Sequence, residues 1–269
     1  MPFLELTRPA NSAMAAFAVW LGYSLALRQP AFDVTVLLLA AATFLVSAGG
    51  QAINDYFDRE VDALRKPHRP IPSGRIKPNT AYAYSMLLFA TGVFFAGLFS
   101  LGAAVYAVFF AALLYAYSAF LRKVKWIGNW LIALSTAAAI MFGAFAVGEY
   151  VLPGFLALAA FFANAGREIT KDLEDLNADR GFKTSLAMLI GEAKARLVAG
   201  FCFALAAIIA LYPATGIIAK QHFIVILLVG VLATFYALIE LFKRDYRASQ
   251  VASKAAMVIL LLAYAAALF

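Results

Sequence analysis

The chain has 269 residues, of which 64% are hydrophobic and 14% are charged, and its mean hydropathy is +0.85. A soluble domain carries about 25% charged residues, so this composition excludes a soluble globular protein and indicates an integral membrane protein. The single cysteine excludes a disulfide framework. The formal net charge of +7 is explained by membrane orientation and attraction to the anionic lipid bilayer, and no nucleic-acid partner is expected.

Nine apolar segments follow one another along the chain, and each is long enough to cross a bilayer as a helix. They comprise residues 9–28, 33–57, 79–100, 102–121, 127–148, 152–174, 185–212, 219–242 and 249–269. None alternates as the strands of a membrane barrel do, and none has the composition of a linker. We therefore predict an all-α membrane protein, a bundle of nine transmembrane helices in a single domain over residues 1–269, with no cleaved signal.

The lysines and arginines are distributed unequally between the two ends of these helices. Twenty of the 22 lie at the amino terminus and in the even-numbered connections, whereas Arg28 and Lys220 lie on the opposite side. The positive-inside rule places the first side in the cytoplasm. Both acidic clusters described below also lie on this side, so we expect an active site at the cytoplasmic face of the cell membrane.

The first acidic cluster lies at the end of the second segment, in the run NDYFDREVDALRKPHRPIPSGRI from Asn54 to Ile76. Asn54, Asp58 and Asp62 are spaced i, i+4 and i+8, which places them on one face of a helix. Asp55 points about 100° away from that face on an ideal helix, and we interpret it as a helix-end residue.

A cationic loop follows this cluster. Arg65, Lys66 and Arg69 lie directly beyond the oxygen ligands, a pattern that indicates a hard metal ion held together with a multiply charged anion. These three residues are therefore candidates for binding a diphosphate. The prolines of the loop predict an extended segment, and Ser73-Gly74 predicts a turn.

The second acidic cluster lies near the end of the sixth segment, in the run NAGREITKDLEDLNADRGFKTS. Asp172, Asp175 and Asp179 are spaced i, i+3 and i+7, again close to one helical face. Interfacial carboxylates that merely pair with nearby cations are the alternative. Two such clusters on one side of the membrane favour a functional site, since ionisable groups in membrane segments are costly unless they are used.

The two clusters together predict a magnesium and diphosphate site. Mg²⁺ prefers oxygen ligands and commonly takes one or two carboxylates with phosphate oxygens and water. We assign Asn54, Asp58 and Asp62 to one half-site, and Asp175 and Asp179 to the other, with Asp172 as an accessory carboxylate. An apolar bundle behind such a site suits an isoprenoid tail, so the chemistry indicated is ionisation of an allylic diphosphate.

The run NDYFDREVD, followed by RPIPSG and by the later acidic pair, resembles the UbiA-type intramembrane prenyltransferase superfamily over nearly the whole chain. The resemblance implies two aspartate motifs that bind Mg²⁺ and diphosphate, and a prenyl tunnel in the helical core. The run REITKDLED is most similar to archaeal digeranylgeranylglyceryl phosphate synthases. That similarity implies transfer of a geranylgeranyl group from geranylgeranyl diphosphate to the free hydroxyl of geranylgeranylglyceryl phosphate, with release of diphosphate.

Further substrate-binding candidates lie at the same ends of other segments. The family places polar contacts at the start of the first helix, tyrosine rings stabilise cations by their faces, and lysine or arginine grips phosphate groups. The candidates are Arg8, Asn11, Tyr115, Tyr117, Ser118, Lys123, Lys125, Arg167, Lys171 and Lys183. We expect the last group, Arg167, Lys171 and Lys183, to bind the acceptor's phosphate, with Glu168 pairing with one of them.

Two alternatives stay open from sequence. The same ionisation chemistry serves the prenylation of an aromatic quinone precursor or a chlorin. A cation transporter is the alternative from a different class, and it would place its carboxylates near the bilayer midplane at broken helices. For the general base, Asp62 and Asp172 are both candidates, and their spacing does not decide between them.

Overall fold

The computed structural model describes residues 1–121, 124–176 and 184–269, with Lys125 described by its backbone alone. These residues form helices joined by turns, with one isolated bridge between Val124 and Thr184. This confirms the predicted all-α class. The chain divides into two compact units, Met1–Trp20 with Ala31–Arg122, and Leu21–Pro30 with Lys123–Phe269.

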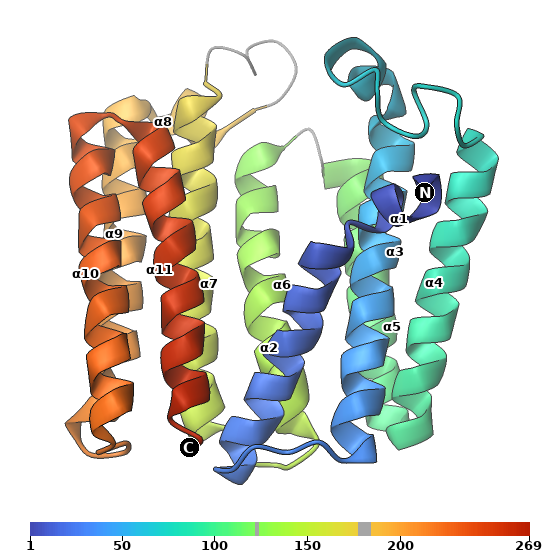
Figure 1. The fold of residues 1–269 in the computed structure, drawn as a ribbon. Helices are drawn as coiled ribbons and strands as arrows, with labels where there is room; N and C mark the ends of the chain where they lie inside the picture. Colours follow the sequence, from blue (N-terminus) through green and yellow to red (C-terminus); the bar gives the residue numbers. More distant parts are fainter. Residues whose placement is uncertain (122–123, 177–183) are drawn as a thin grey trace. The chain divides into compact units, whose positions relative to one another are not determined.

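The first unit is built around one long helix. Its elements are α1 (Pro2–Thr7), the first part of α2 (Pro9–Leu27), α3 (Val34–Arg65), α4 (Pro78–Phe99), α5 (Leu101–Ala116) and a π-helical turn (Tyr117–Leu121). α3 packs against α1, α4 and α5, and Figure 1 shows α3, α4 and α5 lying side by side.

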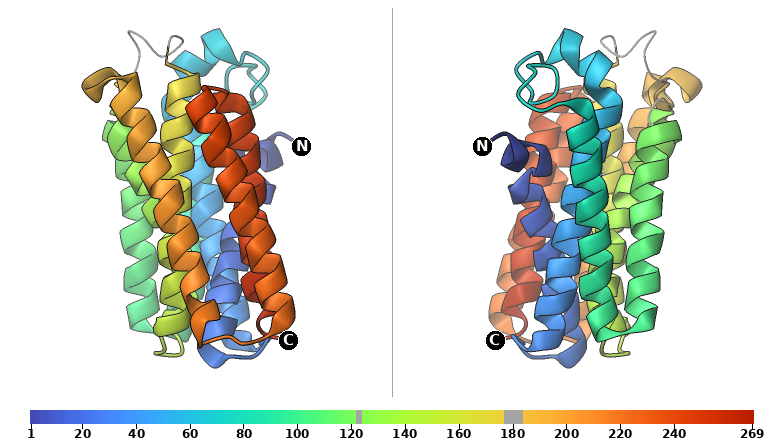
Figure 2. Two further views of the ribbon diagram at one scale, coloured as in Figure 1. Left: turned by 90° about the vertical axis from the view of Figure 1, so that its left-hand side faces the viewer. Right: turned by 90° about the vertical axis from the view of Figure 1, so that its right-hand side faces the viewer.

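The second unit is centred on α7. Its elements are the last part of α2, α6 (Lys125–Phe145), α7 (Val151–Glu174), α8 (Leu186–Ile190), α9 (Glu192–Leu211), a 3-10 turn (Tyr212–Thr215), α10 (Gln221–Lys243) and α11 (Tyr246–Ala266). α7 packs against α6, α9 and α11, whereas α10 and α11 lie along each other (Figure 2).

The long helices agree with the predicted spans. Among the described residues, eight helices are long and apolar enough to cross a membrane. α7 is the ninth long helix, and it falls short because Asn164, Arg167 and Glu168 lower the hydropathy of its second half. Two predicted boundaries differ from the structure. The segment 33–57 continues as a helix to Arg65, and the segment 185–212 is interrupted at Gly191, whose φ is +86°.

α3 begins and ends at recognisable signals. The carboxylate of Asp33 accepts a hydrogen bond from the Val36 amide at 3.1 Å, which caps the amino terminus. At the other end Lys66 N donates to Asp62 O at 2.7 Å, and Pro67 then prevents a further turn. Because the helix continues beyond its apolar part, the whole first acidic cluster lies on regular helix.

Each helix that carries an acidic cluster approaches its neighbour closely through a glycine. A Cβ atom on Gly49 of α3 would lie 2.8 Å from the Phe89 ring of α4. A Cβ atom on Gly166 of α7 would lie 3.0 Å from the Phe203 ring of α9. Any larger side chain at either position would have to displace the neighbouring helix or its ring.

The loop between α3 and α4 is compact rather than extended, so the prediction of an extended segment was wrong. Ser73 N donates to Arg69 O, and Ile76 N donates to Pro70 O, both at 3.0 Å. Gly74 has a φ of +75°, as the predicted turn requires. Ile71 and Ile76 are buried against α1, α3 and α4. The fixed φ of proline is compatible with turns, and burial of these isoleucines favours the folded loop.

Candidate active site

The first acidic cluster forms the predicted helical face. Asn54 Nδ2 donates to Asp58 Oδ2 at 3.1 Å, which orients both side chains on the same side of α3. Asp62 follows one turn later, close to the helix end. These three side chains present amide and carboxylate oxygens in a line, as a hard divalent cation requires.

Asp55 lies at the centre of an ion-pair network, which corrects its interpretation as a simple helix-end residue. It is 4% exposed, and its Oδ1 accepts from Arg8 Nη2 at 2.6 Å and from Arg69 Nη1 at 3.0 Å. The same nitrogen of Arg69 lies 2.5 Å from Asp62 Oδ2. Two of the predicted anion-binding residues, Arg8 and Arg69, are therefore brought together by a carboxylate that helical spacing directs away from the cluster.

Arg8 adopts an unusual backbone conformation at the junction of α1 and α2. Its φ of +43° and ψ of +66° lie in the left-handed region, although it is not a glycine. Such a residue costs about 1–3 kcal/mol and persists only where surrounding contacts hold it. The 2.6 Å ion pair with Asp55 is one such contact. The junction thus directs a guanidinium to the end of α3.

The loop after α3 is tied to α1 by a second arginine. Arg75 donates to both carboxylate oxygens of Glu5, at 2.5 Å and 3.2 Å, and also to the carbonyl of His68 at 2.5 Å. The guanidinium beside Glu5 holds the pKa of that carboxyl below its usual value. This exposed tie joins α1 to the loop that carries Arg69, and the burial of Ile71 fixes the position of that loop.

Aromatic side chains surround the first cluster. Phe57 meets Tyr115 edge-to-face at 5.6 Å between ring centroids, and Tyr82 lies 6.5 Å from the same ring. Tyr115 thus lies beside the α3 segment that carries Asp58, and its predicted contact with an allylic cation stays a prediction. Ser118 is buried and donates to Leu114 O at 2.9 Å within its own helix, and Tyr117 begins the π-helical turn.

The remaining predicted residues of the first unit lie at the surface. Arg65 and Lys66, at the end of α3, are exposed, and so is Asn11 near the start of α2. In the sequence, Arg65 and Lys66 follow Asp62 closely, at the same end of α3. Asn11 shares the start of α2 with the junction that carries Arg8.

The second acidic cluster lies at the end of α7. Asp172 is fully buried, and its Oδ2 accepts from Asn129 Nδ2 of α6 at 2.7 Å. Asp175 terminates α7, and its amide donates to Lys171 O at 2.9 Å. Asp172 and Asp175 are therefore three residues apart, one buried inside the unit and one at the helix end.

The predicted pairing of Glu168 with its cationic neighbours is confirmed. Arg167 Nη1 lies 2.7 Å from Glu168 Oε1, and Lys171 Nζ lies 3.8 Å from Glu168 Oε2. Glu168 is buried, so these cations compensate its charge. Six residues after Glu168, Glu174 accepts a hydrogen bond from Gln250 of α11.

Several predicted residues lie outside the described part of the chain. They are Lys123, Asp179 and Lys183, together with the side chain of Lys125. Within the described residues, no three histidine, cysteine or acidic side chains gather into a metal site. The donor set nevertheless fits Mg²⁺, because this ion uses one or two protein carboxylates and takes the rest of its ligands from phosphate and water. Asn54 and Asp58 supply such a partial set.

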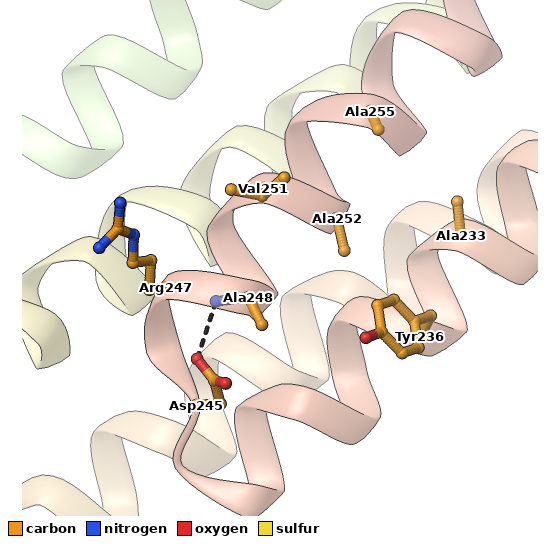
Figure 3. A pocket seen from close by; sticks show the side chains of 8 residues that line it. All are labelled: Ala233, Tyr236, Asp245, Arg247, Ala248, Val251, Ala252 and Ala255. Atoms are coloured by element: carbon orange, nitrogen blue, oxygen red, sulfur yellow. Dashed lines mark hydrogen bonds between the residues drawn. The ribbon is translucent and has the colours of Figure 1, made fainter.

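A surface groove of about 530 Å³ lies between α10 and α11 (Figure 3). Its lining residues are Ala233, Tyr236, Asp245, Arg247, Ala248, Val251, Ala252 and Ala255. Asp245 is the one carboxylate among them, and it accepts from the Ala248 amide at 2.9 Å as the cap of α11. One carboxylate that already caps a helix does not provide a metal site. The groove contains no residue of either acidic cluster.

Sequence reasoning missed two residues, Asp55 and Asn129. Asn129 is 2% exposed in the middle of the run WIGNWL. A strongly polar amide within an apolar segment is itself a signal of a buried hydrogen bond. Asp55 offered no such signal, since it stands among the other charges of the first cluster.

Residues 15–265 match the UbiA prenyltransferase family. The digeranylgeranylglyceryl phosphate synthase of Thermococcus gammatolerans is 40% identical over 210 residues, covering 77% of this chain and 75% of that relative. The synthase of the same name from Methanopyrus kandleri is 41% identical over 242 residues, covering 86% and 88%. A solved structure from work on digeranylgeranylglyceryl phosphate synthase in membranes has a TM-score of 0.84 at 32% identity, over 99% of this chain and 98% of the other.

Proposed function

Because this chain belongs to the UbiA prenyltransferase family, we propose that it transfers a geranylgeranyl group from geranylgeranyl diphosphate to the free hydroxyl of geranylgeranylglyceryl phosphate. This reaction forms the second ether bond of an archaeal membrane lipid and releases diphosphate. Two observations support the proposal. The chain presents acidic clusters at the ends of α3 and α7, and it is 40% identical to a synthase of this name.

The donor's diphosphate is held by both clusters. Asn54, Asp58 and Asp62 serve one half-site, and Asp175 and Asp179 serve the other. These carboxylates would hold Mg²⁺, which would supply positive charge against the charge that develops on the departing diphosphate. Asn129 orients Asp172 as an accessory carboxylate, on the basis of their 2.7 Å hydrogen bond.

The chain's own residues guide a two-stage substitution. The bond between C1 of the prenyl group and the diphosphate oxygen breaks, and its electron pair leaves with the diphosphate. Lys66 and Arg69 donate hydrogen bonds to that leaving group, while the ring of Tyr115 faces the allylic cation. The acceptor's hydroxyl oxygen then bonds to C1 and loses its proton, for which Asp62 and Asp172 are the two candidate acceptors.

The acceptor carries a phosphate and needs a second anion site. Arg167, Lys171 and Lys183 serve this role, with Lys123 and Lys125 as further phosphate contacts. Arg8 and Asn11 lie at the start of α2, where a polar headgroup meets the bilayer surface. Both lipid substrates reach the site from the bilayer, with their chains within the helical bundle.

The chain is a multi-pass membrane protein. We place it in the cell membrane with both clusters facing the cytoplasm, because twenty of its 22 lysines and arginines lie on that side. We further propose that the two units act as one prenyltransferase domain. The family match runs from residue 15 to residue 265 without a break, which supports this view.

The transporter alternative is not supported. Asp58 and Asp62 lie in the last turns of α3, and Asp172 and Asp175 lie at the end of α7. Both helices are continuous up to these residues, whereas a transporter would use broken helices near the midplane.

The proposal is tested with purified protein, geranylgeranyl diphosphate, Mg²⁺ and a set of acceptors. We expect diphosphate release and an ether product of the expected mass with geranylgeranylglyceryl phosphate, and loss of both after chelation of Mg²⁺. Activity with 4-hydroxybenzoate but not with geranylgeranylglyceryl phosphate would overturn the choice of acceptor. Full activity after complete metal removal would overturn the metal mechanism.

A further inference from the structure

Asp55 has no part in the reaction described above, yet it joins two arginines to the first acidic cluster. Arg8 Nη2 and Arg69 Nη1 both contact Asp55 Oδ1, at 2.6 Å and 3.0 Å. Arg69 Nη1 also contacts Asp62 Oδ2 at 2.5 Å. One nitrogen therefore bridges a carboxylate assigned to the metal and a carboxylate that is not.

We propose that Asp55 is a positioning residue for Arg69. When Asp62 binds the metal, Arg69 keeps its contact with Asp55, and its guanidinium moves from Asp62 to the diphosphate. This inference rests on the proposed function, because it assigns Asp62 to Mg²⁺. The inference assigns a function to Asp55, which is not one of the proposed metal ligands. It also gives an order of events, in which the guanidinium of Arg69 leaves Asp62 as the cation binds.

The exchange follows from the geometry of the shared carboxylate. Magnesium binds carboxylate oxygens at about 2.0–2.1 Å, whereas the guanidinium of Arg69 lies 2.5 Å from Asp62 Oδ2. Two cations at one oxygen repel each other strongly where solvent is scarce, and Asp62 is buried. Mg²⁺ bound to Oδ2 of Asp62 would therefore displace the guanidinium from that oxygen.

Asp55 is built to keep that guanidinium nearby. Its side chain is 6% exposed, and Arg8 contacts the same oxygen that Arg69 contacts. Arg8 lies at the junction of α1 and α2, so its contact joins Asp55 to a second segment of the chain. Asp55 is thus a stationary anchor from which Arg69 can turn towards the diphosphate without leaving the site.

The test compares Asp55→Asn with Glu60→Gln, which removes one carboxylate charge from an exposed position of the same helix. Mn²⁺ is the probe, and its binding in the presence of inorganic diphosphate is measured by electron paramagnetic resonance. Without its anchor, Arg69 pairs with Asp62 alone and competes with the cation. We expect the Mn²⁺ dissociation constant to rise about tenfold or more in Asp55→Asn and to stay unchanged in Glu60→Gln.

A second comparison separates positioning from a structural role. In an Arg69→Gln background, Asp55→Asn should have no further effect on Mn²⁺ binding, because both changes act through one guanidinium. If Asp55→Asn does not fold, Arg8→Lys, which shortens the side chain that contacts Asp55, carries the same comparison. Unchanged Mn²⁺ binding in the folded variant, or effects that add in the double variant, would overturn the inference. A wild-type protein that binds no Mn²⁺ with diphosphate would instead refute the proposed function beneath it.

Discussion

Among the described contacts, one aspartate at each acidic helix end has a partner of a different kind. At the end of α3, a guanidinium contacts the motif's own Asp62 at 2.5 Å. At the end of α7, the contact that orients Asp172 comes from the neutral amide of Asn129 at 2.7 Å. The guanidinium of Arg167 contacts Glu168, which stands outside the Asp175 and Asp179 pair.

A charged partner and a neutral partner have different effects on a carboxylate. A guanidinium fixes the geometry of a carboxylate and also neutralises its charge, whereas an amide fixes geometry alone. A cation therefore enters the α3 cluster by exchange with Arg69, while Asn129 can stay bonded to Asp172 throughout. Substitutions in the two clusters should accordingly have different consequences for metal binding.

The largest effects are expected where both clusters are equivalent, at the carboxylates themselves. Asp58→Asn and Asp175→Asn should each lower kcat by about 10²–10³-fold or more, because each removes a group that stabilises the departing diphosphate. The measurement is diphosphate release with purified protein, with thermal unfolding in detergent as the control for folding. A near-normal rate in either variant would remove its cluster from the site.

A smaller effect is expected from the amide in the second cluster. Asn129→Ala removes the hydrogen bond that orients Asp172, and loss of such a supporting contact lowers activity about 10–100-fold. Asn164→Ala is the matched control, since its amide donates to Ala160 O within its own helix. If the two variants have equal rates, the orientation of Asp172 has no importance for catalysis.

The supporting glycines should affect stability before they affect rate. Gly49→Ala brings a methyl group to 2.8 Å from the Phe89 ring, and Gly166→Ala brings one to 3.0 Å from the Phe203 ring. Overpacking of this kind costs about 1–3 kcal/mol, so thermal unfolding should show a lower Tm for both. Gly97→Ala is the control, because its nearest neighbour lies at 3.7 Å. An unchanged Tm for Gly49→Ala would mean that α3 and α4 separate easily.

The smallest effect is expected at the exposed tie between α1 and the loop. Arg75 holds the pKa of Glu5 below its usual value, so this pair stabilises the protein at neutral pH and loses that effect as the pH falls through the lowered pKa. Exposed pairs contribute little. Glu5→Gln should therefore leave kcat and Tm unchanged at pH 7. A clear loss of activity would show that the tie holds Arg69 in place.

The sequence predicted what depends on local periodicity. Hydropathy and 3.6 residues per turn give the helical class, the nine long helices among the described residues, and the common face of Asn54 and Asp58. The pairing of Glu168 with Arg167 is also local, since the two are neighbours in the chain.

What could not be predicted depends on partners distant in sequence. Helical spacing shows that Asp55 leaves the face of Asp58, but not that Arg8, 47 residues earlier, contacts it. The partner of Asp172 lies 43 residues before it. The compact loop was missed for a similar reason, because burial of Ile71 against α1 overrides the extended tendency of its prolines.

The network of Arg8, Asp55, Asp62 and Arg69 has a consequence for membrane insertion. It contains two positive and two negative groups, so the assembled network has no net charge, whereas each group alone is costly near hydrocarbon. Its members come from the α1–α2 junction, from α3 and from the loop beyond α3. The network can therefore close only after the translocating chain has delivered all three segments.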